Sequence, residues 1–209
     1  ELRRTIAVVG QTGAWLDKFC PTVEQPWRET RRIQRAMDRS RRATNPEHYN
    51  EDGSVKHGAR LWVRSSGYRA LRAQLAETER CLASERKRSH GELANRVLTI
   101  GNVVRTEKIS SRSFQKNFGR SVKVRAPGMF ISALGRKAES AGGRVETFPT
   151  RTTRLSQVCL CGCIEKKPLS QRIHRCDCGV GPVQRDLFSG FLARFVVEDR
   201  LDARQAAIA

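Results

Sequence analysis

The stretch LSQVCLCGCIEKKPLSQRIHRCDCGVGPVQRDL, residues 155–187, carries the strongest structural signal in the chain. It contains two short cysteine knuckles, Cys159-Leu160-Cys161-Gly162 and Cys176-Asp177-Cys178-Gly179. In a zinc ribbon, two such knuckles turn sharply, helped by glycine, so that four thiolates surround one tetrahedral ion. We therefore predict zinc ligands at Cys159, Cys161, Cys176 and Cys178. With all four positions filled by protein atoms, the zinc is expected to be structural rather than catalytic.

The exact ligand set stays open at this point. Both knuckles have C-x-C spacing, whereas C-x-x-C is usual, and Cys163 and His174 are further candidate ligands. The competing interpretation is a set of free thiols in a degenerate module. Five of the seven cysteines lie in this one stretch and no export signal opens the chain, which argues against a disulfide framework.

The charge of the chain indicates a polyanionic partner. The 209 residues include 40 Lys and Arg against 21 Asp and Glu, a formal net charge of +19. Nucleic acid is the default partner of such a basic chain. The hydrophobic fraction is 38%, enough for a lean core, and no apolar run is long enough to span a membrane.

The rest of the chain predicts a mixed α/β fold. The apolar run Thr5–Val9, a glycine-bearing turn and residues 14–20 favour a β-hairpin. We expect further strands ending near Glu107 and at 144–148, and a loop at 43–58. The expected helices cover residues 28–42, 65–97, 127–140 and 183–199.

Two acidic residues stand out in this basic chain. Glu107 ends an apolar strand and Asp186 lies in the first turn of the last expected helix. A helix start favours an acid through its dipole and capping, which is the structural explanation for Asp186. Metal-dependent nucleases instead need several carboxylates that converge on their ions.

The first expected helix is rich in arginine, which binds phosphate well. The alternative is a solvated helix whose arginines pair with nearby acids such as Glu29 and Asp38. The candidate nucleic-acid contacts are Arg31, Arg32, Arg35, Arg39, Arg41 and Arg42.

Several motifs, in a shared order along nearly the whole chain, resemble TnpB proteins, the transposon-encoded RNA-guided nucleases related to type V CRISPR effectors. The motifs are Asp38–Pro46, Tyr49-Asn50-x-Asp52-Gly53, Arg120-Ser121-Val122, Ala126–Phe130, Leu155-Ser156-Gln157-x-Cys-x-Cys-Gly, Lys167-x-Leu169-Ser170-x-Arg172, His174-x-Cys-x-Cys-Gly and Gln184–Leu187.

The resemblance implies an RNase H-like (RuvC) mixed sheet with a helical-hairpin insertion and a zinc ribbon. The nuclease core would cover 1–28, 98–154 and 182–209, the basic hairpin 29–97 and the ribbon 155–181. Glu107 and Asp186 match the second and third catalytic carboxylates of the family. The resemblance further implies catalytic magnesium, a guide RNA and a DNA target.

The chain departs from the family at its start. The family's first catalytic Asp lies on a strand just before the segment matching Thr5–Val9, where this chain has only Glu1-Leu2-Arg3-Arg4. The family's N-terminal half, which binds the guide RNA and reads the target-adjacent motif, has no counterpart here. We therefore expect either a fragment of a longer protein, whose missing half is a partner, or a decayed copy.

Three functions follow as expectations. The first is the C-terminal part of a TnpB-like DNA endonuclease associated with an insertion sequence and transposition. The second is a nuclease-dead protein that binds nucleic acid without cutting it. The third is a zinc-stabilised basic protein that assembles with another chain. In each case the expected location is the prokaryotic cytoplasm, associated with the nucleoid.

Overall fold

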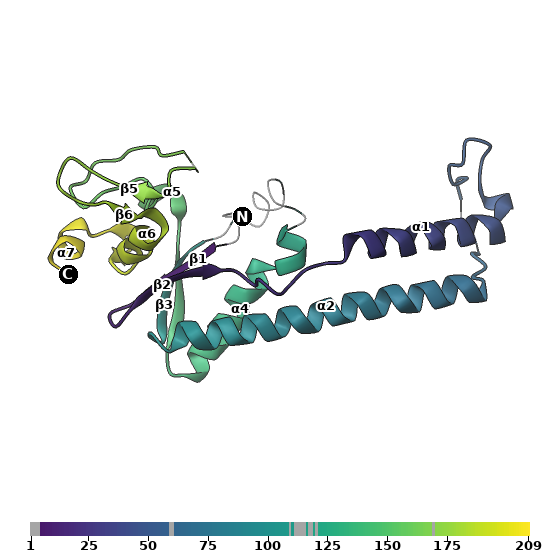
Figure 1. Ribbon diagram of the computed structural model, residues 1–209, viewed down its shortest axis with the longest axis horizontal. Coiled ribbons are helices and arrows are strands. Elements are labelled where there is room, and N and C mark those ends of the chain that lie inside the picture. The colour runs from purple at the N-terminus through teal and green to yellow at the C-terminus, as the bar shows by residue number, and fades with distance from the viewer. Residues whose placement is uncertain are drawn as a thin grey trace. The chain divides into compact units, whose positions relative to one another are not determined.

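The computed structural model describes residues 5–58, 61–108, 110, 116, 119, 121–168 and 170–209. Within them the chain is mixed α/β, as its sequence predicts (Figure 1). It divides into two compact units. Thr22–Lys87 is here called the hairpin unit, and the chain up to Pro21 together with Arg88–Ala209 is called the core unit. The expectations for Glu1–Arg4, Arg120 and Leu169 lie outside the described residues.

The hairpin unit consists of α1 (Trp27–Thr44) and most of α2 (Ser66–Leu98), which run antiparallel to each other. Side-chain hydrogen bonds join the segment before α1 to α2, among them one of 2.6 Å from Thr22 to Glu85. Ile33, 1% exposed, is the most buried residue of α1. Residues spaced three or four apart along α2 form one stripe, and all of them are partly or fully buried: Tyr68, Leu71, Leu75, Thr78 and Leu82.

Two β-ribbons form the centre of the core unit. In the first, β1 (Thr5–Val9) pairs with β2 (Ala14–Lys18) in an antiparallel hairpin. In the second, β3 (Val103–Glu107) pairs in parallel with β4 (Arg144–Phe148). The parallel pairing requires a crossover connection, and α4 (Pro127–Ser140) forms part of it. Proline fits the first position of α4, because a backbone N–H at that position would have no hydrogen-bond acceptor within the helix.

Both ribbons pack against one group of helix residues. In α2 and α4, this group comprises Ala94, Val97, Phe130 and Leu134, each no more than 5% exposed. The strand residues that pack against it come from both ribbons: Ile6, Val8, Trp15, Val104 and Val145. The two ribbons therefore cover the same helical layer.

A second cluster lies around α6 (Arg185–Ala193). This helix also contacts β1, where Val9 lies against the backbone of Gly190. A side chain at Gly190 would reach the Val9 methyl group, so glycine allows the close approach. The cluster is formed by Phe148, Leu155, Val158, Phe188, Leu192, Val196 and Ala206.

The cysteine stretch follows α5 (Thr150–Thr153) and contains one short antiparallel pair, β5 (Ile173–His174) with β6 (Val183–Gln184). Its residues Leu155 and Val158 belong to the α6 cluster. The cysteine module is thus anchored on the helix that carries Asp186.

The last expected helix is shorter than the sequence suggests. It ends at Ala193, and a hairpin of β7 (Val196–Val197) and β8 (Arg200–Leu201) follows before α7 (Ala203–Ile208). Glu198 and Asp199 form the turn with φ of 47° and 62°. Hairpin turns of this kind favour Asn-Gly, so the Glu-Asp pair gives little sequence signal.

The described strands form four separate two-stranded sheets. β1 pairs with a described strand along only one of its two edges, and the same is true of β3. The described strands therefore do not form the single mixed sheet implied by the resemblance. The pairs β1–β2 and β3–β4 are two separate ribbons over a common helical layer. Over the described part of the chain, helices long and apolar enough to cross a lipid bilayer are absent.

Candidate functional site

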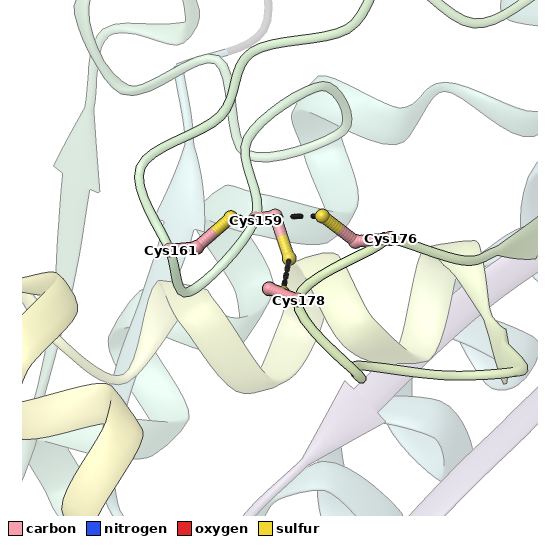
Figure 2. A group of neighbouring side chains, drawn as sticks. All are labelled: Cys159, Cys161, Cys176 and Cys178. Carbon is pink, nitrogen blue, oxygen red and sulfur yellow. Dashed lines mark hydrogen bonds between the residues drawn. The ribbon is translucent and has the colours of Figure 1, made fainter.

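Four cysteine side chains converge in the core unit. The Sγ atoms of Cys159, Cys161, Cys176 and Cys178 all lie within 4.8 Å of one another (Figure 2). The pairs Cys159–Cys178 and Cys161–Cys176 are each separated by 3.6 Å between sulfur atoms. This is far beyond the bond length of a disulfide, about 2.05 Å.

The two knuckles are built in the same way. In the first, Gly162 donates its backbone N–H to the Cys159 carbonyl at 2.9 Å. In the second, Gly179 donates to the Cys176 carbonyl at 3.1 Å. Both glycines have positive φ, 84° and 93°, which other residues adopt only with strain. This repeated turn is what presents two thiols from each knuckle to the same point.

The spacing of the thiols fits a zinc ion. With Zn–S bonds of about 2.3 Å, neighbouring sulfurs of a tetrahedron are separated by about 3.8 Å. The observed separations of 3.6 Å are close to this value. Four close cysteines can therefore hold a metal ion such as zinc, with every coordination position filled by protein. Among the described His, Cys, Asp and Glu residues, no second group of three or more is close enough to do so.

Cys163 and His174 lie outside this group of four. Cys163 is exposed, and its carbonyl accepts a hydrogen bond from the Cys159 N–H at 2.9 Å. His174 is only 2% exposed, and its ring stacks on Phe188 with 4.5 Å between centroids. His174 therefore contributes packing between the cysteine module and α6.

The thiols differ in their surroundings. Burial raises the pKa of Cys159 to about 12, which disfavours its thiolate in the absence of a cation. A backbone hydrogen bond from Cys163 lowers the pKa of the exposed Cys161. Thiolates are the ligand form, so metal binding at this centre releases protons.

The two acidic candidates line one cleft in the core unit. The cleft has a volume of about 1870 Å³ and runs between β1 and β3, with α6 contributing to its wall. Glu107 at the end of β3 and Asp186 in the first turn of α6 are both among its lining residues. Residues that are distant in the sequence are thus brought to one solvent-accessible space.

Glu107 is exposed at the end of β3, where it faces the cleft. The partial loss of water around its carboxyl raises the pKa of Glu107. This residue is therefore harder to ionise than an ordinary glutamate unless a cation is supplied.

Asp186 has nitrogen donors on several sides. Arg172 Nη1 and Gln184 Nε2 each lie 3.4 Å from its Oδ2 atom. Arg185 Nε lies 3.5 Å from Oδ1. The helix start explains part of this environment, because the Gln184 side chain caps α6 by accepting from the Leu187 N–H at 2.7 Å.

The arginines of α1 fall into two groups. Arg32 makes two hydrogen bonds to Glu29, and Arg41 and Arg42 both pair with Asp38. Arg41 and Arg42 also lie over aromatic rings, Trp62 and Tyr49 respectively. These three arginines therefore form their ion pairs and ring contacts within the hairpin unit.

The second group of α1 arginines makes no such contacts among the described residues. Its members are exposed, and none pairs with a carboxylate among the described residues. Their spacing of three, four and four places them on one helical face over about 16 Å. The group comprises Arg28, Arg31, Arg35 and Arg39, of which Arg28, the first residue of the expected helix, was not among the contacts predicted from the sequence.

The chain matches no protein-family model, and no curated protein matches its sequence. The function of the chain is therefore argued from its own residues and motifs.

The first prediction concerns the cysteine centre. Cys176→Ser removes one of four converging ligands, and we expect loss of bound zinc and unfolding of the module. Cys163→Ser makes the same chemical change outside the group, and should retain one zinc per chain. Zinc content by mass spectrometry and the Tm of each variant provide the test. Loss of zinc in Cys163→Ser would show that the ligand set is different.

The second prediction follows from the raised pKa of Glu107. As pH rises above about 4.3, the unfolded chain ionises first, so the charge on Glu107 increasingly opposes folding. Glu107→Gln should therefore be more stable than the wild type at pH 7 in magnesium-free buffer, with the difference vanishing below pH 4. The measurement is the free energy of unfolding in urea at pH values from below 4 to 7. The control is Glu139→Gln, since Glu139 is an exposed glutamate. Equal stability of Glu107→Gln and wild type at pH 7 would contradict the prediction.

Proposed function

We propose that this chain is the RuvC and zinc-ribbon portion of a TnpB-like, RNA-guided DNA endonuclease associated with an insertion sequence. The observation that carries the proposal is the shared cleft of Glu107 and Asp186. The motif resemblance assigns these two residues as the second and third catalytic carboxylates. This assignment requires both residues to line the same cleft.

Carboxylate oxygens suit magnesium, which is usually held by one or two carboxylates together with substrate phosphates. Glu107 and Asp186 would hold it in this cleft. Bound magnesium would supply activation of water for attack on a phosphodiester. Burial raises the pKa of Glu107, and a bound cation would favour its ionised form.

The family's first carboxylate would come from a strand ahead of Thr5. The cleft offers a place for it, because β1 and β3 both line the cleft and each has an edge without a described partner strand. A strand inserted there would satisfy backbone groups on both sides. The proposal therefore places the first acid on an inserted strand between the two ribbons.

A second candidate function is nucleic-acid binding without cleavage. It is favoured by the contacts of Asp186, whose charge is already offset by Arg172 and Arg185. It is also favoured by the exposed face of Arg28, Arg31, Arg35 and Arg39, which can contact phosphates with no metal. We propose this face as the nucleic-acid interface in either case, with Arg32, Arg41 and Arg42 maintaining the hairpin.

The cleavage proposal is tested with single-stranded DNA and magnesium. In a protein that also carries the first-acid strand, we expect the cleavage shown by the wild type to be lost in Glu107→Gln and in Asp186→Asn, because each removes a charged metal ligand. Glu139→Gln, an exposed acid on α4, should cut normally. Salt-sensitive DNA binding without any cleavage by the wild type would instead support the binding candidate.

The arginine face is tested by salt-dependent binding to duplex DNA. Loss of one phosphate contact lowers the slope of log K against log salt by about 0.9. We expect this change for Arg35→Gln and for Arg39→Gln. Arg200→Gln removes the same charge from β8, in the core unit, and should leave the slope unchanged. Equal slopes for all variants would reject the face as an interface.

A further inference from the structure

Cys163 is an exposed thiol beside the four-cysteine centre. The module contains five of the seven cysteines of the chain, and Cys163 is the one that lies outside the group of four candidate ligands. Its side chain is exposed to solvent. A cysteine that neither binds the metal nor fills a core is expected to matter through the reactivity of its sulfur.

The repeat within the module shows that its fold does not need a thiol at this position. In both knuckles the first cysteine donates its backbone N–H, at 2.9 Å, to the carbonyl of the residue after the glycine. That acceptor is Cys163 for Cys159 and Val180 for Cys176. Val180 packs against the α6 cluster, whereas the equivalent Cys163 is exposed. Cysteine at position 163 therefore adds a chemical group rather than a structural one.

Cys163 contacts one of the four candidate ligands directly. Both its backbone N–H and its thiol hydrogen-bond to the sulfur of Cys161. Only Gly162 separates the two cysteines, and its φ of 84° bends the chain between them. Residues two apart lie at most about 7 Å from each other in an extended chain, and a bend shortens this distance toward the about 4.4–6.8 Å that a disulfide spans. A disulfide between Cys161 and Cys163 therefore needs only local adjustment of one knuckle.

Cys163 differs from the other sulfur neighbours of Cys161 because it is not a candidate ligand. The sulfur of Cys176 lies 3.6 Å from that of Cys161, but a disulfide between these two would remove two ligands from a bound zinc. A disulfide from Cys161 to Cys163 removes only one. Cys161 is exposed, so a small oxidant can reach it from solvent. The least disruptive disulfide in the module is thus the one between Cys161 and Cys163.

We propose that Cys161 and Cys163 form a peroxide-reactive pair, in which Cys161 is oxidised first and Cys163 resolves it to a disulfide. Reactive cysteines of this kind are solvent-accessible thiolates that lie next to a resolving thiol. Cys161 meets this description as an exposed ligand of a zinc-thiolate centre, and Cys163 supplies the neighbouring thiol. The oxidant is hydrogen peroxide or another small peroxide.

The reaction has two balanced steps. In the first, the Cys161 thiolate attacks one peroxide oxygen, so that an S–O bond forms, the O–O bond breaks and hydroxide leaves. In the second, the Cys163 sulfur attacks the resulting sulfenic sulfur, so that an S–S bond forms and the S–O bond breaks. The departing hydroxide takes the proton of the Cys163 thiol and leaves as water. The two sulfurs together lose two electrons, and the peroxide is reduced to water and hydroxide.

The disulfide weakens the hold of the module on zinc, because only three of the four thiolates remain. Metal binding and folding of such a module are coupled, so loss of a ligand releases the metal and loosens the fold. A thiol reductant reverses the change, since a disulfide lies on the reversible part of the cysteine oxidation ladder. The oxidation concerns the cysteine centre alone, so it holds whether or not the chain binds or cuts nucleic acid.

The test treats the zinc-loaded full chain with hydrogen peroxide. Released zinc is followed with a chromogenic chelator, and the oxidised cysteines are located by mass spectrometry of peptides. In the wild type we expect a peptide two hydrogen atoms lighter, with the disulfide between Cys161 and Cys163. A thiol reductant with added zinc should restore the original zinc content almost completely.

Cys163→Ser removes only the resolving thiol. We expect Cys161 in this variant to gain oxygen atoms instead, and the reductant to restore less than about half of the released zinc, because sulfinic acid is not reduced by thiols. Cys163→Val, which copies Val180 of the second knuckle, should behave in the same way. Both variants must contain one zinc per chain before treatment, which shows that the module is folded.

The matched control is Cys81→Ser, which removes an exposed thiol from α2 and should release and regain zinc like the wild type. Two results would overturn the proposal. One is a wild-type disulfide that joins Cys161 to Cys159 or Cys176 instead of Cys163. The other is equal recovery of zinc by the wild type and Cys163→Ser.

Discussion

The core unit depends on one shared apolar contact, in which two separate β-ribbons bury side chains against the same residues of α2 and α4. A two-stranded ribbon is at best marginally stable alone in water. Phe130 and Leu134 give both ribbons a common surface, with Ile6 on one side and Val104 on the other. Because this contact holds β1 and β3 along one cleft, the position of Glu107 at the end of β3 follows from it. Asp186 is positioned by α6, which contacts β1.

Much of the local structure was readable from residue patterns. Pro127 and the double glycine after Ala141 bounded α4, and the β-branched run from Thr5 marked β1. The cysteine knuckles predicted convergence of four thiols, which the structure confirms as a group that can hold a metal. These signals are local, since they depend on the chemistry of one residue and its near neighbours.

Long-range pairing was not readable in the same way. The apolar, β-branched runs of β1 and β3 indicate strands, but they do not state which strand lies beside each edge. The hairpin after α6 was missed because Glu198 and Asp199 adopt positive φ without the usual Asn or Gly. The loose contact of Arg172 with Asp186 was also out of reach, since it depends on the β5–β6 pairing.

Net charge alone does not locate a nucleic-acid interface in this chain. Arg32, Arg41 and Arg105 each form an ion pair with a carboxylate, so their positive charge is already largely compensated within the protein. A charge that is already paired gains little from a phosphate, because the new contact must replace the old one. What distinguishes the face of Arg28 and Arg35 is guanidinium donor capacity that the described protein leaves unused. For a basic protein, guanidinium donors without a protein partner are therefore a better guide to a proposed polyanion site than total charge is.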